Sequence, residues 1–278
     1  LKTNTETPPP ADFRGHEFFE ASSIRKIDGK YVFVYSSTNN HELCWAVSDR
    51  PDGGFRFGGT LVDQGDLYLN GNTDEAHAMN YLGNTHGGMV QLRDDWYIFY
   101  HRQTNRHSYS RQACAERLVR TPDGGFRQAE VTSCGLNGGP LQGKGEYPAR
   151  IACCLWGKEG TVRYDRKFDR DRHPYFTQDK KDGDHSARQY IANMQDGSVA
   201  GFRRFDMKDA QYVRITLGGN ASGTMEVSAS PDFSVIAACV PVKTEGQETQ
   251  VCAQLSIPDG VQPLWFRFTG EGRLDFYS

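Results

Sequence analysis

The stretch RGHEFFEASSIRKIDGKYVFVYSS, residues 14–37, has the pattern of a β-hairpin. Its second half, Tyr31–Tyr35, is rich in β-branched and aromatic residues, and the dipeptide Asp28-Gly29 stands just before it. Asp-Gly readily takes the positive φ angles that a two-residue hairpin turn requires. We therefore predict two antiparallel strands joined at Asp28-Gly29.

The same pattern occurs a second time. Residues 23–35 resemble residues 88–100, which lie 65 positions later, and SDRPDGGFRF (48–57) resembles VRTPDGGFRQ (119–128), which lies 71 positions later. Each unit is predicted to hold four antiparallel strands, the last after the Pro-Asp-Gly-Gly turn, as in a β-propeller blade. Because two blades alone leave large faces exposed, we expect earlier blades outside this sequence. The opening without Met agrees with a missing upstream part, joined to this chain or present as a separate fragment.

The C-terminal part has a different pattern. Residues 143–157 are predicted to add a strand that closes the ring, and the charged residues 158–181 to cross between domains. Seven short strands separated by turn residues follow, which favours a β-sandwich of jelly-roll type. The prediction is an all-β chain with part of a β-propeller over residues 1–160 and a sandwich over residues 175–278.

The composition excludes several classes of protein. The chain has 278 residues and a net charge of −3, so it lacks the basic character of a nucleic-acid-binding protein. No apolar run approaches the length of a membrane helix, and no signal peptide is visible. Its seven cysteines include no Cys-x-x-Cys pair, and buried free thiols are the favoured interpretation.

Three clusters carry candidate chemistry. They are Glu20 beside Phe18 and Phe19, GNTHGG (83–88) around His86, and residues 100–113, which include Arg111. At the repeat offset of 65 residues, Ala21 aligns with His86, so Glu20 and His86 occupy near-equivalent places in successive blades. Both side chains are predicted to face one cavity. The alternatives are a solvated Glu20, a His86 that only caps its turn and an Arg111 that pairs with a surface acid.

The segments FFEASSIRKIDGKYVFVYSS, GNTHGGMVQLRDDWYIFYHRQ, SRQACAE and EYPARIACCLWG, in this order, resemble the second half of a glycoside hydrolase family 43 enzyme. This resemblance covers about residues 14–157. It implies a five-bladed propeller with Glu20 as general acid and Arg111 and Phe19 at the substrate. His86 would be the hub histidine, which contacts substrate and approaches a central calcium ion or its waters. The mechanism would be inverting, and its general base and a pKa-tuning Asp would lie in earlier blades.

The last hundred residues resemble carbohydrate-binding module family 6. The resemblance rests on QYIANM (189–194), GSVAGF (197–202), GTMEV (223–227) and the strands around Trp265 and Asp275. It implies a structural calcium ion, with Asp275 as a candidate ligand. Trp265 is predicted to lie in the core, because a sugar-stacking aromatic must be exposed.

These resemblances imply a hydrolase that releases terminal α-L-arabinofuranose or β-D-xylose from arabinan, arabinoxylan or derived oligosaccharides. The alternative from another class is a non-catalytic carbohydrate-binding protein. A propeller that serves only as a protein-interaction scaffold is a weaker alternative, because it does not explain why Glu20, His86 and Arg111 occur together.

Overall fold

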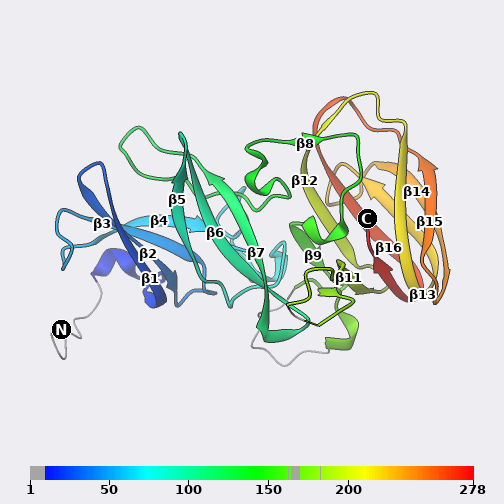
Figure 1. Ribbon diagram of the computed structural model, residues 1–278, viewed down its shortest axis with the longest axis horizontal. Helices are drawn as coiled ribbons and strands as arrows, with labels where there is room; N and C mark the ends of the chain where they lie inside the picture. Colours follow the sequence, from blue (N-terminus) through cyan, green and yellow to red (C-terminus); the bar gives the residue numbers. More distant parts are fainter. Residues whose placement is uncertain (1–9, 162, 164–169, 182) are drawn as a thin grey trace.

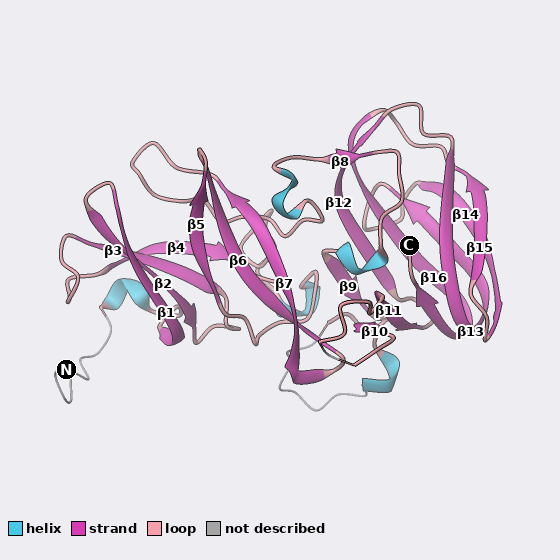
Figure 2. Cartoon of the chain, in the orientation of Figure 1, coloured by secondary structure: helices cyan, strands magenta, loops and turns pink. Residues whose placement is uncertain are grey.

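The computed structural model describes residues 10–161, 163, 170–181 and 183–278. These residues form three β-sheets, which follow one another along the long axis of the molecule (Figures 1 and 2). The helices of the described part are single 3-10 turns: η1 Ala11–Phe13, η2 Glu75–His77, η3 Gly135–Asn137, η4 Ala149–Ile151 and η5 Arg170–Arg172. None of them is long and apolar enough to cross a membrane. The predicted all-β fold class is confirmed.

The first sheet is the predicted first repeat unit. Its four antiparallel strands are β1 Phe18–Ile27, β2 Lys30–Ser37, β3 Leu43–Ser48 and β4 Arg56–Val62, in that order. Asp28 and Gly29 have φ angles of 49° and 81°, as the turn between β1 and β2 requires. The hairpin predicted from residues 14–37 is therefore confirmed.

The second sheet has one regular strand fewer than predicted. It contains β5 Gly87–Leu92, β6 Asp95–Thr104 and β7 His107–Leu118. Around the second Pro-Asp-Gly-Gly turn, isolated bridges take the place of a regular strand: Arg120 pairs with Phe126, and Ala129 pairs with Val62 of the first unit. The chain then turns to the first unit, where the Ala129 N–H donates to the Leu61 carbonyl at 2.8 Å. The prediction of a fourth strand is wrong here because this backbone pairs with the preceding unit.

One hydrophobic core joins the first two sheets and reaches the third. It contains Val34 and Trp45 from the first sheet, Met89 and Ile98 from the second, and Trp265 from the third. Trp265 is 2% exposed, so its predicted place in the core is confirmed.

The third sheet folds over on itself around a large core. Its strands are β8 Leu141–Gln142, β9 Cys154–Trp156, β10 Tyr175–Gln178, β11 Gln189–Met194, β12 Val199–Met207, β13 Tyr212–Ser228, β14 Ile236–Glu245, β15 Thr249–Gln254 and β16 Gly260–Phe276. The first half of β13 pairs with β15, and its second half pairs with β14. On its other edge, β13 pairs with most of the length of β16. The two halves face each other across core residues such as Ile215, Val240, Phe268 and Phe276.

Residues 143–157 do not close a propeller ring. β9 pairs with β12 through Val199, Ala200 and Gly201, and β8 pairs with β12 in parallel. The ring-closing prediction is therefore wrong, because these apolar residues find their backbone partners on the third sheet. The division into residues 1–160 and 175–278 stays a prediction, and part of the expected crossing (162 and 164–169) lies outside the described residues.

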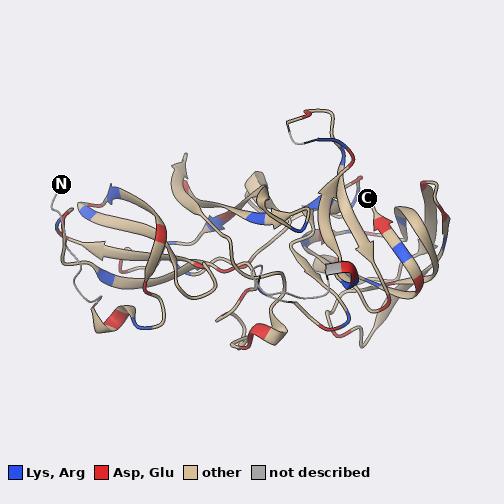
Figure 3. Cartoon of the chain, turned by 90° about the horizontal axis from the view of Figure 1, so that it is seen from below, with Lys and Arg blue, Asp and Glu red and all other residues tan. Residues whose placement is uncertain are grey.

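Charge and thiols are dispersed. Acidic and basic residues are interspersed along the described part of the molecule (Figure 3). All seven cysteines are free, but Cys239 and Cys252 are exposed. The expectation of burial is wrong for these two because they occupy outward positions of the alternating strands β14 and β15.

Candidate active site

A β-bulge in β1 sets the position of Glu20. Phe18 pairs with Ser37 and Glu20 with Ser36, but the next paired residue is Ser23. Ala21, inside this irregularity, has a φ angle of 60°. A bulge bends its strand and redirects the neighbouring side chain. This bend gives Glu20 a direction that a regular strand would not.

Glu20 and His86 form a close pair. His86 precedes β5, and its Nε2 lies 2.5 Å from Oε1 of Glu20. The side chains of Glu20 and His86 are 41% and 33% exposed respectively, so the pair lies at the surface rather than in the core. The turn before His86 is anchored by Asn84, which has a φ angle of 55° and whose side-chain amide donates to the Ser108 carbonyl at 2.8 Å. The convergence predicted from the repeat offset therefore occurs.

A second histidine links this pair to Arg111. The rings of His86 and His101 lie 5.3 Å apart, and Nη1 of Arg111 donates to Nε2 of His101 at 3.1 Å. Burial, together with the charge of Arg111 and of His86, lowers the pKa of His101 to about 4. His101 is therefore a neutral imidazole that accepts from Arg111. Because Nε of Arg111 also donates to the Ser108 carbonyl, its guanidinium is held at two points.

Phe19 lies on the rim of this cluster. Its ring is 4.7 Å from that of His41, and it is 48% exposed. His41 in turn accepts the backbone N–H of Asn84 at 3.1 Å through Nδ1. These contacts place Phe19 beside the turn that carries His86.

Asp275 lies apart from these residues. It belongs to β16, is half-buried and accepts the backbone N–H of Asn193 at 3.2 Å. Burial raises its pKa above the ordinary value of an aspartate. Calcium prefers six to eight oxygen ligands, and neither Asp275 nor His86 belongs to a group of three potential ligands in the described part of the chain. The residues present do not by themselves fit a calcium site at either position.

The one such group that the described residues form is His16, Glu42 and Cys44. Glu42 is fully buried, and its two oxygens already accept from His16, Ser37 and Thr60. We interpret this group as a satisfied hydrogen-bond network.

Two residues of the candidate site, His101 and Gln64, were not predicted from the sequence. His101 lies in the third sequence cluster, but no role was predicted for it. Its position in the alternating pattern of β6 could have indicated that it faces the site. Gln64, which is 5% exposed, donates to Thr85 Oγ1 and to the His101 carbonyl through Nε2. No local motif marks Gln64, because its partners lie 21 and 37 residues away.

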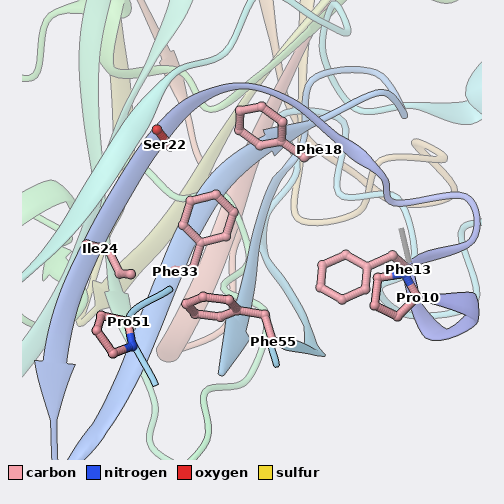
Figure 4. Close-up of a pocket in the computed structure, with 8 residues that line it drawn as sticks. All are labelled: Pro10, Phe13, Phe18, Ser22, Ile24, Phe33, Pro51 and Phe55. Atoms are coloured by element: carbon pink, nitrogen blue, oxygen red, sulfur yellow. The ribbon is translucent and has the colours of Figure 1, made fainter. Parts of the chain in front are cut away.

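An apolar pocket of about 420 Å³ lies on the face of the first sheet that points away from the second sheet. Phe18, Phe33 and Phe55 point into it, and Pro10 and Phe13 border it (Figure 4). It offers one hydroxyl, Ser22, and no charged group, so it is not suited to acid–base chemistry.

Comparison with known proteins gives partial matches. No family model matches the chain. It is 44% identical over 268 residues to "Xylosidase/arabinosidase" from Thermoclostridium stercorarium, a match that covers 96% of this chain and 56% of that protein. The chain thus spans little more than half of this relative. Homologues named xylosidase/arabinosidase therefore match over most of the chain, and the relationship indicated by the sequence motifs is confirmed.

Two solved structures are similar to parts of the fold. One is a family 43 arabinoxylan arabinofuranohydrolase from Bacillus subtilis in complex with cellotetraose, with 18% identity, a TM-score of 0.48 and coverage of 94% of this chain and 53% of that chain. The other is CsCBM6-3 from Clostridium stercorarium in complex with cellobiose, with 15% identity, a TM-score of 0.37 and coverage of 50% of this chain and 95% of that chain.

Proposed function

We propose that this chain, whose homologues over most of its length are named xylosidase/arabinosidase, is the C-terminal part of a glycoside hydrolase. The full-length protein would release terminal α-L-arabinofuranose or β-D-xylose from arabinoxylan, arabinan or their oligosaccharides. The observation that carries the proposal is the pairing of Glu20 with His86 at 2.5 Å, with both side chains partly exposed to solvent. Carbohydrate is accordingly its proposed partner.

In the proposed reaction, Glu20 donates a proton to the departing glycosidic oxygen. His86 holds the Glu20 carboxyl in place through its Nε2 contact. Arg111, fixed by His101 and Ser108, presents its remaining N–H groups to substrate hydroxyls. Phe19 supplies an exposed ring at the rim for an apolar sugar face.

An inverting mechanism needs a second carboxylate about 6.5–9.5 Å from the acid, with room for the attacking water. We place this general base in the part of the full-length protein that precedes the chain. The apolar pocket at Phe18, Phe33 and Phe55 supports this arrangement, because it offers a partly exposed aromatic surface on which a further blade would pack (Figure 4). Whether that part is continuous or a separate fragment is decided by the intact mass of the purified protein.

Calcium stays a prediction within this proposal. Because the chain itself does not supply the oxygen ligands, a calcium ion near His86 would take them from the preceding blades and from water.

The test replaces Glu20 by Gln in the full-length protein and uses two substrate types. With xylo- or arabino-oligosaccharides, we expect kcat/KM to fall about 10²–10⁴-fold, the usual worth of general acid catalysis. With dinitrophenyl pentosides, whose leaving group needs no proton, the loss should be much smaller. Comparing the α-L-arabinofuranoside with the β-D-xyloside identifies the sugar.

Glu17→Gln is the matched control, since Glu17 lies three residues away and its carboxylate accepts hydrogen bonds from Gly15 and Thr38. It should keep wild-type rates. Unchanged oligosaccharide hydrolysis by Glu20→Gln would rule out the assignment. A full-length protein that binds xylan but hydrolyses none of these substrates would favour the carbohydrate-binding alternative.

A further inference from the structure

A buried arginine of the third sheet reaches the loop that follows the first sheet. Arg203 lies on β12 and is 5% exposed. Its Nη2 donates to Asp66 Oδ2, and its Nη1 donates to Glu130 Oε1 at 2.9 Å. In Figure 1, β12 lies on the side of the third sheet that faces β7. Arg203 thus joins the C-terminal sheet to the units that carry the candidate acid site.

Asp66 belongs to a rigid turn. The Asp63 carboxylate accepts the backbone N–H of Gly65 at 2.8 Å and of Leu67 at 3.2 Å. Asp66 itself has a φ angle of 54°, in the left-handed region that non-glycine residues rarely adopt. Its Oδ1 accepts the Val131 N–H at 2.9 Å, so each of its oxygens has a partner. This unfavourable conformation depends on the groups that hold the Asp66 side chain.

The same turn also forms hydrogen bonds to the two segments that carry His86 and His101. Gln64, two residues before Asp66, donates to Thr85, the residue before His86, and to the backbone carbonyl of His101 at 2.8 Å. Both contacts are buried or partly buried. A shift of the turn would therefore move His86 and His101 together, and with them the contacts to Glu20 and Arg111.

We propose that Arg203 is a positioning residue, which fixes the acid site through the turn Asp63–Leu67 and the side chain of Gln64. The C-terminal sheet then has a role in catalysis that is separate from any binding of glycan. The catalytic part of this inference rests on the proposed function, whereas its structural part does not.

Arg204 provides a matched control. It is the next residue and also binds Glu130, with Nη2 at 2.7 and 2.6 Å from the two carboxylate oxygens. It is partly exposed, and within the described residues it forms no hydrogen bond or ion pair with Asp66. Arg203→Met and Arg204→Met therefore remove the same type of charge from the same cluster. Only the first removes the contact to the turn.

The experiment uses the full-length protein and measures two quantities. Amide hydrogen exchange of segments 63–67, 83–88 and 99–103 should rise in Arg203→Met and stay at the wild-type level in Arg204→Met. On oligosaccharide, kcat should fall about 10- to 100-fold in Arg203→Met with a smaller change in KM, as a displaced catalytic group predicts. Because hydrogen exchange does not depend on activity, it tests the structural part of the inference even if the proposed function is wrong.

Two milder variants cover the case in which Arg203→Met fails to fold. Asp66→Asn keeps the shape of the side chain but removes its charge. Gln64→Ala removes only the hydrogen bonds from the turn to Thr85 and to the His101 carbonyl. Gln64→Ala should raise exchange in 83–88 and 99–103 but not in the β12 segment, and its effect on kcat should not add to that of Asp66→Asn. Unchanged exchange in 83–88 and 99–103 for both Asp66→Asn and Gln64→Ala would overturn the proposal.

Discussion

Buried carboxyl groups determine how single residues of this chain respond to pH. Burial raises the pKa of Asp63 to about 7 and that of Glu116 to about 8. Glu116 lies in β7, is 3% exposed and contacts Tyr100 and Thr132. Because water cannot reach the charged form, each group favours its neutral form until the pH exceeds its raised pKa.

Glu116→Gln should therefore remove a pH dependence of stability. The pKa of Glu116 is raised from 4.5 to about 8 on folding. The folded state then binds a proton that the unfolded state has released, so its contribution to stability is full below about 4.5 and is lost as the pH rises through about 8. Glutamine stays neutral, so we expect Glu116→Gln to gain roughly 1–3 kcal/mol over wild type between pH 5 and pH 9.

Denaturant unfolding at both pH values measures this difference. Glu146→Gln serves as control, because Glu146 is exposed. Equal pH profiles for wild type and Glu116→Gln would show that Glu116 is ionised in the folded protein.

The candidate site was predictable only in part at this scale. The repeat offset brought Glu20 and His86 together because equivalent positions of adjacent blades converge, and the pair is observed. Arg111 reaches them only through His101, and Gln64 holds both histidine segments from a loop with no motif. Such contacts depend on side-chain packing between distant segments, which spacing in the sequence does not encode.

At the scale of elements, two long strands replace several predicted short ones. The seven short strands predicted for the C-terminal part include Tyr212–Leu217, Thr224–Ala229, Leu264–Phe268 and Arg273–Tyr277. In the structure the first two lie in β13 apart from Ala229, and the last two lie in β16 apart from Tyr277. Glycines between them were interpreted as turns. In the structure they allow each strand to bend from one layer to the other without breaking its hydrogen bonds. Composition identifies a glycine-rich segment but does not distinguish a turn from a bend.

Gly270→Ala should damage this bend. Gly270 pairs with Gly223, and the two have φ angles of 155° and 153°. A Cβ on Gly270 would collide with the Ser222 carbonyl of the facing strand. Because backbone atoms cannot move aside without breaking the ladder, we expect a loss of about 2–4 kcal/mol in the free energy of unfolding.

Thermal and urea unfolding measure this loss. Gly139→Ala is the control, since a Cβ there meets nothing within 4 Å, and it should change stability little. A Gly270→Ala variant as stable as Gly139→Ala would mean that the paired strands separate easily at this point.

At the scale of the whole molecule, the two faces of the first sheet differ. One face packs on the second sheet through Val34, Leu43 and Trp45. The other carries the aromatic cluster of Phe13, Tyr35 and Phe33, beside which Phe18 is 49% exposed and Ile24 46% exposed. Exposed apolar patches of this kind usually mark a contact surface. The preceding blade proposed above would cover this second face.

Phe18→Glu in the full-length protein tests this arrangement. If a preceding blade covers the aromatic face, the new carboxylate is buried without a partner, and we expect the free energy of unfolding to fall by about 2–4 kcal/mol. Val235→Glu is the control, because Val235, in the bend just before β14, is 72% exposed and should accept a charge at little cost. The difference between the two variants isolates burial of the face from the general effect of an added charge. Equal stability of Phe18→Glu and Val235→Glu would mean that the face stays open to water, and the general base would then have to reach Glu20 by another route.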